Sequence, residues 1–160
     1  MRPPVDAFVA LGSNLANPPA QLRRATIALG RLPDTRFVAG SRWYRTAPVG
    51  DADQPQYLNA VVHLRTALAP YTLLGALLLI ESAQGRIRGP ERWGPRTLDL
   101  DLVLYGDLVL DDPRLTLPHP RLHERRFVLE PLAELAPDLE IPGRGRVLRV
   151  LMDLNPATTG

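Results

Sequence analysis

The hydrophobic and polar positions of this chain follow the two-residue period of a strand in some segments and the 3.6-residue period of a helix in others. The changes from one period to the other mark the ends of the expected strands and helices. Residues 5–11 form a short apolar run that ends at Gly12-Ser13-Asn14, which predicts a buried strand followed by a turn. Asn17 before Pro18 is typical of a helix N-cap with proline at the first helical position. That helix should end at Pro33-Asp34. Its apolar residues share one face and are Leu22, Ala25, Leu29 and Leu32.

The rest of the chain continues the alternation of strands and helices. Residues 57–65 are expected to form a strand, and its two faces are Leu58, Ala60, Val62 and Leu64 against Tyr57, Asn59, Val61 and His63. The other expected elements are strands over residues 36–46, 97–105 and 108–110 and helices over residues 69–84 and 125–135. Two long polar loops, 47–56 and 85–96, lie between them, and loops of this length often act as lids.

This order of elements predicts an α+β protein with a ferredoxin-like fold. The order β-α-β-β-α-β is the split βαβ arrangement, which forms an antiparallel sheet flanked by helices, and here an extra C-terminal helix follows. There is no internal repeat or linker, so residues 1–160 should form a single domain, with about four residues frayed at the start and about seven at the end. A fold class alone assigns no function.

Composition narrows the classes of function. A chain of 160 residues with 45% hydrophobic residues is long enough to bury a core. Cysteine is absent, which excludes disulfides and thiolate catalysis. All 19 basic residues are arginine, and a P-loop enzyme is excluded because its phosphate site needs a lysine. The chain shows no signal-peptide pattern and no apolar run of membrane-spanning length, so we expect a cytoplasmic protein with no membrane partner.

Two carboxylates in the predicted strand 97–105 form the most informative chemical pattern. Asp99 and Asp101 should point to the same face of that strand, about 7 Å apart. Like charges at this spacing repel each other, and a divalent cation such as Mg²⁺ would relieve the repulsion. Metal together with arginine is typical of phosphoryl transfer. The arginines available for it are Arg86, Arg88, Arg92, Arg96, Arg121, Arg125 and Arg126.

Each of these features also has an ordinary structural explanation. A strand with one solvated face often carries aspartates, and arginine clusters are common on surfaces. Tyr57 and Phe127 could pack in a core, and His119, held between two prolines, could be a capping residue. Arginines with aromatics on a ferredoxin-like sheet also occur in RNA-binding domains. The glycine and phenylalanine pattern of those domains is missing, however, and paired aspartates would repel a phosphate backbone.

Longer motifs reveal a family resemblance that covers residues 5–151. At residues 92–102 stands the central motif, RWGPRTLDLDL. The other motifs are ALGSNL, YRTAPVG, DQPQYLNAVV, GRIR and LPHPRLHERRFVLEPL. Together they resemble the 6-hydroxymethyl-7,8-dihydropterin pyrophosphokinases of folate biosynthesis.

The resemblance implies transfer of pyrophosphate from ATP to the hydroxymethyl group of a dihydropterin, with release of AMP. It implies two Mg²⁺ ions at Asp99 and Asp101, with Arg86 and Arg96 as further catalytic residues. The residues implied to bind the pterin are Gly12, Thr46, Ala47, Val49, Tyr57, Asn59, Trp93 and Phe127. The residues implied to bind ATP are Glu81, Arg88, Arg92, Trp93, Leu102, Arg114, Leu115, Thr116, His119 and Arg125. Family members commonly act as monomers on these small molecules, without nucleic acid.

Two positions depart from the family pattern. Leu78 stands where some members have a glutamine, three residues before Glu81 on the same helical face. Pro120 replaces an aromatic residue of some relatives. Both departures concern contacts to the nucleotide, and neither involves Asp99 or Asp101.

Two other functions fit part of the pattern. A palm-like nucleotidyltransferase also uses a D-x-D pair, although this chain is short for that class. A non-catalytic RNA-binding module would use the arginines and aromatics alone. Release of AMP that depends on the pterin would separate the pyrophosphokinase from both.

Overall fold

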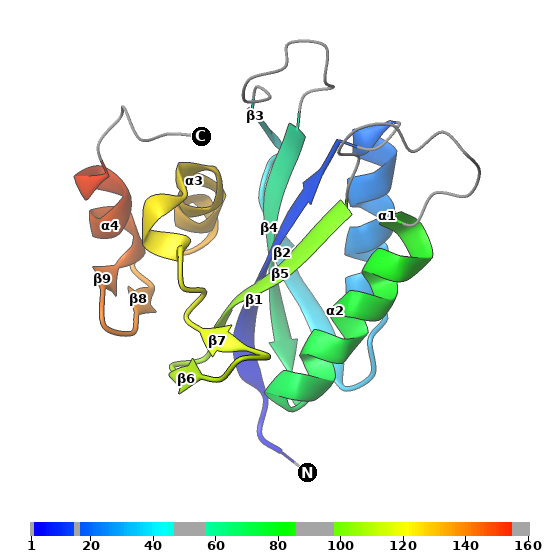
Figure 1. The fold of residues 1–160 in the computed structure, drawn as a ribbon, viewed down its shortest axis with the longest axis horizontal. Coiled ribbons are helices and arrows are strands. Elements are labelled where there is room, and N and C mark those ends of the chain that lie inside the picture. Colours follow the sequence, from blue (N-terminus) through cyan, green and yellow to red (C-terminus); the bar gives the residue numbers. More distant parts are fainter. Residues whose placement is uncertain (1, 15–16, 47–56, 86–97, 155–160) are drawn as a thin grey trace.

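The computed structural model describes residues 2–14, 17–46, 57–85 and 98–154 (Figure 1). The large sheet contains β1 (Val5–Ser13), β2 (Thr35–Gly40), β3 (Tyr44–Thr46), β4 (Tyr57–Thr66) and β5 (Leu98–Tyr105). Two small ribbons pair β6 (Leu110–Asp111) with β7 (Thr116–Leu117) and β8 (Glu140–Ile141) with β9 (Gly145–Arg146). The helices are α1 (Pro18–Gly30), α2 (Pro70–Gly85), α3 (Arg126–Leu135) and α4 (Val147–Asp153), with a 3₁₀ turn, η1, at Leu122–Glu124.

The large sheet confirms the predicted ferredoxin-like fold. Its strand order is β2-β4-β1-β5, with β3 also paired to β4, and all of these pairings are antiparallel. The first strand is therefore central, and β4 lies between β1 and β2, as the split βαβ arrangement requires.

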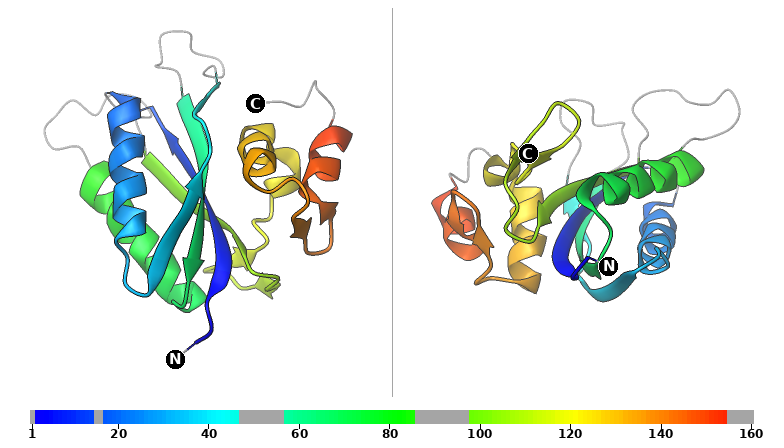
Figure 2. Two further views of the ribbon diagram at one scale, coloured as in Figure 1. Left: turned by 180° about the vertical axis from the view of Figure 1, so that it is seen from behind. Right: turned by 90° about the horizontal axis from the view of Figure 1, so that it is seen from below.

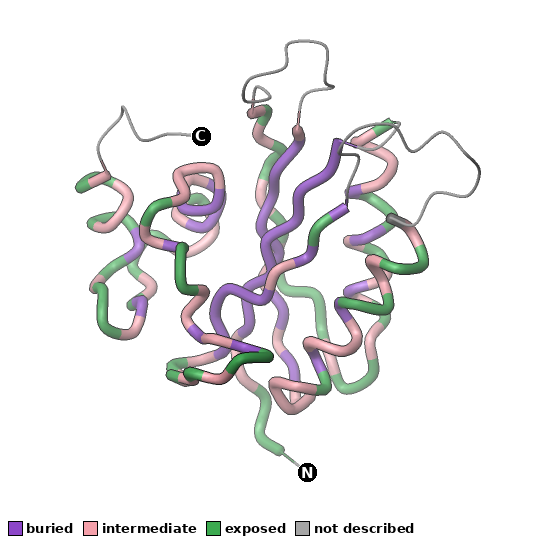
Figure 3. Tube along the Cα trace, in the orientation of Figure 1, coloured by how far each residue is buried: buried purple, intermediate pink, exposed green. Residues whose placement is uncertain are grey.

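Helices cover both faces of the sheet (Figures 1 and 2). One core lies between the sheet and the pair α1 and α2, and a second lies under α3, η1 and α4. Strand β4 supplies its even-numbered residues, from Leu58 to Leu64, to the first core and Val61 to the second, which confirms the predicted division of its faces. The central strands are accordingly buried along most of their length (Figure 3).

The first helix begins as predicted but ends earlier. The Asn17 side chain accepts a hydrogen bond from the Ala20 backbone N–H at 3.4 Å, which confirms the N-cap. The prediction that the helix runs to Pro33 is wrong, because α1 ends at Gly30. Leu32 still packs against the core from the segment that follows. Apolar contact alone therefore does not mark the end of a helix.

Two strand predictions also need correction. The turn expected at Gly12-Ser13 is wrong, because both residues continue β1 and pair with β4 on one side and β5 on the other. Pairing on two edges outweighs the local preference of glycine for turns. The strand expected over 36–46 is interrupted after Gly40, where Ser41 donates its N–H to the Val61 carbonyl at 2.9 Å and accepts from the Val61 N–H through Oγ at 2.9 Å.

The C-terminal part contains more structure than the sequence indicated. The short strand expected over 108–110 begins only at Leu110, and η1, α4 and the ribbon of β8 and β9 were not predicted. The predicted loop 47–56, nearly all of 85–96 and the tail after residue 154 lie outside the described residues. Within the part of the chain that the structure describes, no helix is long and apolar enough to cross a membrane.

Helix α2 offers a matched test of the core. Leu77 is fully buried in the core under this helix, whereas Leu79 on the same helix is 73% exposed. Leu77→Ala should lower the free energy of unfolding by about 2–5 kcal/mol, because it removes buried contacts and leaves a cavity. Leu79→Ala should change it by about 0.5 kcal/mol or less. Urea unfolding of the two variants measures both values, and equal effects would contradict this core assignment.

Candidate active site

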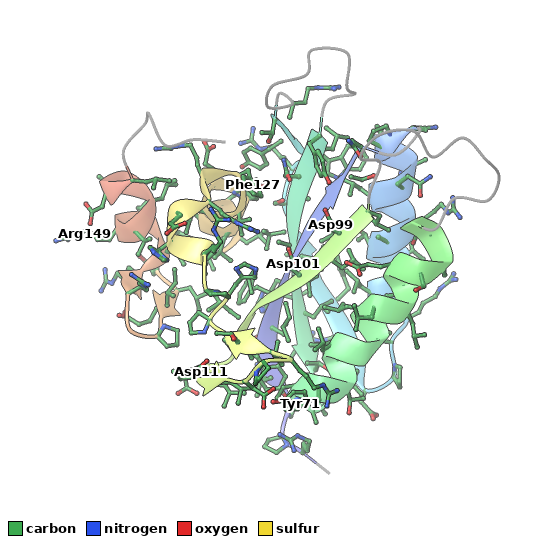
Figure 4. All side chains as sticks on the ribbon, viewed as in Figure 1. Tyr71, Asp99, Asp101, Asp111, Phe127 and Arg149 are labelled. Atoms are coloured by element: carbon green, nitrogen blue, oxygen red, sulfur yellow. The ribbon has the colours of Figure 1, made fainter. Side chains whose placement is uncertain are left out.

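Asp99 and Asp101 lie on β5 and point toward the side of the sheet that carries α3, as Figure 4 shows. The residues between and beside them, Leu98, Leu100 and Leu102, point the other way and are buried under α1 and α2. The prediction that the two carboxylates share one face is therefore confirmed. Asp99 is exposed and Asp101 is half-buried. We call these two residues the carboxylate pair.

The surroundings of Asp101 disfavour an isolated negative charge. Burial raises the pKa of the Asp101 carboxyl, His119 lowers it, Asp99 raises it and Arg125 lowers it, and the net result is a raised pKa. The charge of Asp99 thus opposes ionisation of Asp101, as their spacing predicted. A bound cation would relieve this repulsion.

His119 approaches the carboxylate pair from the segment after β7. Its backbone N–H donates to the Val103 carbonyl of β5 at 3.0 Å, and its ring Nδ1 accepts from the Arg121 N–H at 3.2 Å. Burial lowers the pKa of His119; Asp101 raises it, and Arg125 and Arg121 lower it, leaving it below its usual value. A neutral ring with Nδ1 as acceptor carries its proton on Nε2, which can donate one hydrogen bond to an anionic ligand.

A row of residues crosses the sheet beside Asp99. Gly12 of β1 is paired with Asp99 on one side and with Asn59 of β4 on the other. The Tyr57 hydroxyl donates to Asp99 Oδ2 at 3.0 Å. A Cβ atom at position 12 would lie 3.1 Å from Asn59 Oδ1 and 3.2 Å from Tyr57 Cε1, so glycine lets both side chains lie close over β1.

The orientation of the Asn59 amide is fixed by the neighbouring strand. Its Nδ2 donates to Thr46 Oγ1 of β3 at 2.6 Å, and Oδ1 therefore lies over Gly12. The structure thus brings together four predicted pterin residues, Gly12, Thr46, Tyr57 and Asn59. They form one end of the face that carries the carboxylate pair.

Two further predicted residues come from α3 and the residue before it. The Arg125 guanidinium lies over the Phe127 ring, 5.6 Å from its centroid. Phe127 is partly buried against the core under α3. Figure 4 shows Phe127 at the same end of the molecule as Asp99. The sheet and α3 therefore present Tyr57 and Phe127 from two separate layers.

Glu81 reaches β5 from the opposite face of the sheet. Its carboxylate accepts the Leu100 backbone N–H at 2.6 Å. Burial raises the pKa of Glu81, the Leu100 N–H lowers it, and Asp99 and Asp101 raise it, with a net increase. Glu81 thus holds the backbone of the strand that carries the carboxylate pair, and it lies close enough for both aspartates to affect its ionisation.

Four other predicted nucleotide residues lie in β5 or in the segment that follows it. Leu102 and Leu115 have their side chains buried in the core under α1 and α2, so only their backbone groups could meet a ligand. The Arg114 guanidinium lies 5.0 Å from the centroid of the Tyr71 ring at the start of α2, well away from the carboxylate pair in Figure 4. Thr116 donates its hydroxyl to the Asp112 carbonyl at 3.3 Å. Arg114 could therefore meet only a remote part of a ligand bound at Asp101.

The remaining predicted site residues fall in parts of the chain outside the described residues. They are Ala47, Val49, Arg86, Arg88, Arg92, Trp93 and Arg96.

The sequence did not single out Tyr44 or Glu134, which the structure joins beside this site. The Tyr44 hydroxyl donates to Glu134 Oε1 at 2.6 Å although the two residues are 90 positions apart. Tyr44 stands within the YRTAPVG motif, which was the only local signal that pointed to it.

An antiparallel ferredoxin-like sheet that carries a carboxylate pair beside a histidine and an arginine has the features of an enzyme that transfers phosphate-containing groups. Residues 8–137 match the 7,8-dihydro-6-hydroxymethylpterin-pyrophosphokinase family. The chain belongs to this family.

Individual relatives agree with this assignment. The 2-amino-4-hydroxy-6-hydroxymethyldihydropteridine pyrophosphokinase of Pseudomonas aeruginosa is 54% identical over 149 residues, which cover 93% of this chain and 91% of that protein. The enzyme of the same name from Haemophilus influenzae is 48% identical over 138 residues, which cover 86% of each chain. A crystal structure of wild-type Plasmodium falciparum HPPK-DHPS with pteroate has a TM-score of 0.73 at 12% identity, and the match covers 95% of this chain and 42% of that one. That last likeness concerns the fold alone.

Proposed function

We propose that the face around the carboxylate pair is the active site for pyrophosphate transfer from ATP to 6-hydroxymethyl-7,8-dihydropterin, a step of folate biosynthesis. In this reaction the hydroxymethyl oxygen attacks the β-phosphorus of ATP. The bond from that phosphorus to the oxygen bridging the α- and β-phosphates breaks, AMP leaves with that oxygen, and the hydroxyl proton is released. The family assignment and the position of Asp99 beside Tyr57, on the strand that also carries Asp101, support the proposal.

The carboxylate pair fits Mg²⁺. Asp99 and Asp101 provide oxygen ligands on one face. Burial and the Asp99 charge both raise the pKa of Asp101, and a bound cation would favour its ionised form. Two Mg²⁺ ions would be held there, with the remaining ligand positions filled by water and ATP phosphates. When bound, Mg²⁺ neutralises charge on the phosphate chain.

The other residues of the site have roles in binding and orientation. Tyr57 and Phe127 would hold the flat pterin ring between them, and Asn59 Oδ1 would accept a hydrogen bond from the N–H edge of the pterin. His119 Nε2–H and the Arg125 guanidinium would donate to the phosphates of ATP. Arg86, Arg88, Arg92 and Arg96 would contribute further charge, as the family resemblance implies.

The proposal extends to the state of the protein. Residues 1–160 would form a single catalytic domain that acts as a monomer in the cytoplasm, without nucleic acid. Analytical ultracentrifugation at the assay concentration tests whether the protein is a monomer. A mass equal to that of a dimer would contradict this part of the proposal.

The reaction itself provides the decisive test of function. The protein is incubated with ATP, Mg²⁺ and the hydroxymethyl-dihydropterin, and the nucleotide products are separated by chromatography. AMP should form only when the pterin is present. Formation of ADP, release of free pyrophosphate, or AMP that is independent of the pterin would contradict the proposal.

Gly12 provides a test of the pterin site. Gly12→Ala should raise the KM for the pterin about tenfold, because the new methyl group would displace Asn59 and Tyr57 by a few tenths of an ångström. The KM for ATP should change much less. Gly75→Ala is the matched control, since a Cβ at Gly75 of α2 meets nothing within 4 Å. An unchanged KM for the pterin in Gly12→Ala would place the pterin elsewhere.

A further inference from the structure

A hydrogen-bonded cluster joins β3 to α3 at the edge of the sheet. The Glu134 carboxylate accepts the Tyr44 hydroxyl at 2.6 Å and the Arg42 backbone N–H at 3.2 Å and 3.1 Å through its two oxygens. The Arg42 guanidinium reaches the same carboxylate at 3.5 Å and lies over the Tyr44 ring, 5.2 Å from its centroid. We call Arg42, Tyr44 and Glu134 the edge cluster.

We propose that Tyr44 and Glu134 are positioning residues that align α3 with the sheet and so set the geometry of the pterin site. This inference rests on the proposed function and adds residues that contact no reacting atom. Its first support is the strand register. Tyr44 is paired directly with Asn59, so both side chains point to the face of the sheet that carries Gly12 and Asp99.

The second support is the geometry of α3. Phe127 and Glu134 are seven residues apart in this helix, which places them on the same side, about two turns from each other. A contact that fixes Glu134 therefore fixes the rotation of the helix that presents Phe127. Through this contact, the edge cluster links the two layers that supply Tyr57 and Phe127.

The third support is the chemistry of the cluster. The Arg42 side chain is 76% exposed and that of Glu134 is 29% exposed, so their ion pair alone contributes little. The Tyr44 hydroxyl and the Arg42 N–H make charge-assisted bonds, which are stronger. Burial raises the pKa of Glu134, but Tyr44 and Arg42 outweigh it, so the pKa lies below its usual value and the carboxylate stays ionised.

The core beneath α3 should keep this helix folded even when the edge cluster is lost. Leu129 and Leu132 of this helix are fully buried in that core, and neither residue belongs to the edge cluster. Loss of the cluster should therefore leave α3 folded against the sheet and change its alignment. The consequence should be a defect specific to the pterin.

The test compares variants of Tyr44 and Glu134 with a control on the same helix. Tyr44→Phe and Glu134→Ala should each raise the KM for the pterin about tenfold, because each loses a charge-assisted hydrogen bond. The KM for ATP should stay within about twofold of that of the unaltered protein. The double variant should be no worse than Glu134→Ala alone, since both changes break one contact. Glu134→Gln, which keeps an acceptor for Tyr44, should recover part of the loss. Glu130→Ala, on the same helix, is the control and should behave like the unaltered protein.

Three results would overturn the inference. They are an unchanged KM for the pterin, an equal rise in both KM values, and independent effects of the two substitutions. If Glu134→Ala does not fold, Tyr44→Phe decides alone. An inactive unaltered protein would overturn the proposed function instead. In that case, the affinity of each protein for the same pterin is measured by equilibrium titration. Weaker binding by the Tyr44 and Glu134 variants would support this inference, and equal affinities would reject it.

Discussion

Asp101→Ala is expected to lower kcat by about a thousandfold or more, the largest effect of any single substitution considered. The carboxylate is half-buried at the point where the cation and the phosphates would meet, and its loss would leave the cation with fewer oxygen ligands. The fold should remain intact. Because the pKa of Asp101 is raised in the folded protein, its ionised form does not stabilise folding at neutral pH, and loss of the carboxyl should leave Tm nearly unchanged.

Metal removal and a matched aspartate complete this test. Chelation of divalent ions should abolish AMP formation by the unaltered protein, and added Mg²⁺ should restore it. Asp101→Ala should stay inactive at every Mg²⁺ concentration at which Mg²⁺ and ATP both remain in solution. Asp107→Ala, in the exposed turn after β5, should retain normal kcat. A kcat for Asp101→Ala within tenfold of the unaltered protein would contradict the metal site proposed at the carboxylate pair.

The faces of β4 and β5 could be predicted because alternation along a strand decides which residues share a side. Leu98, Leu100 and Leu102 are buried under α1 and α2, so the aspartates between them point the other way. Their partners across the sheet could not be predicted. The register that places Gly12 between Asp99 and Asn59 depends on the pairing of three strands, and a shift by one residue would turn one of these side chains to the opposite face.

The edge cluster shows a second limit of local patterns. Tyr44 lies in a strand of three residues, and Glu134 looks like an ordinary polar residue near the end of an amphipathic helix. Only tertiary packing brings them together, because they are 90 positions apart. The helix α4 was missed for a related reason: it has only seven residues, and tertiary packing rather than helix propensity stabilises so short a helix.

Tyr57→Ala is expected to raise the KM for the pterin by about ten- to a hundredfold, because stacking of a flat heterocycle on an aromatic ring contributes about 1–3 kcal/mol. The KM for ATP should rise much less. Tyr57 also donates to Asp99 at 3.0 Å, so its loss removes a hydrogen bond from the carboxylate pair. Steady-state kinetics with each substrate varied in turn measure the two KM values separately.

Tyr57→Phe separates the two roles of this residue. It keeps the ring over Gly12 and removes only the hydroxyl that reaches Asp99. If stacking is the main role, Tyr57→Phe should retain most of the affinity for the pterin, and its residual defect should appear in the Mg²⁺ dependence of kcat. Equal increases of both KM values in Tyr57→Ala would instead assign the ring to packing between β4 and β1. A large pterin defect in Tyr57→Phe would transfer the binding role from the ring to the hydroxyl.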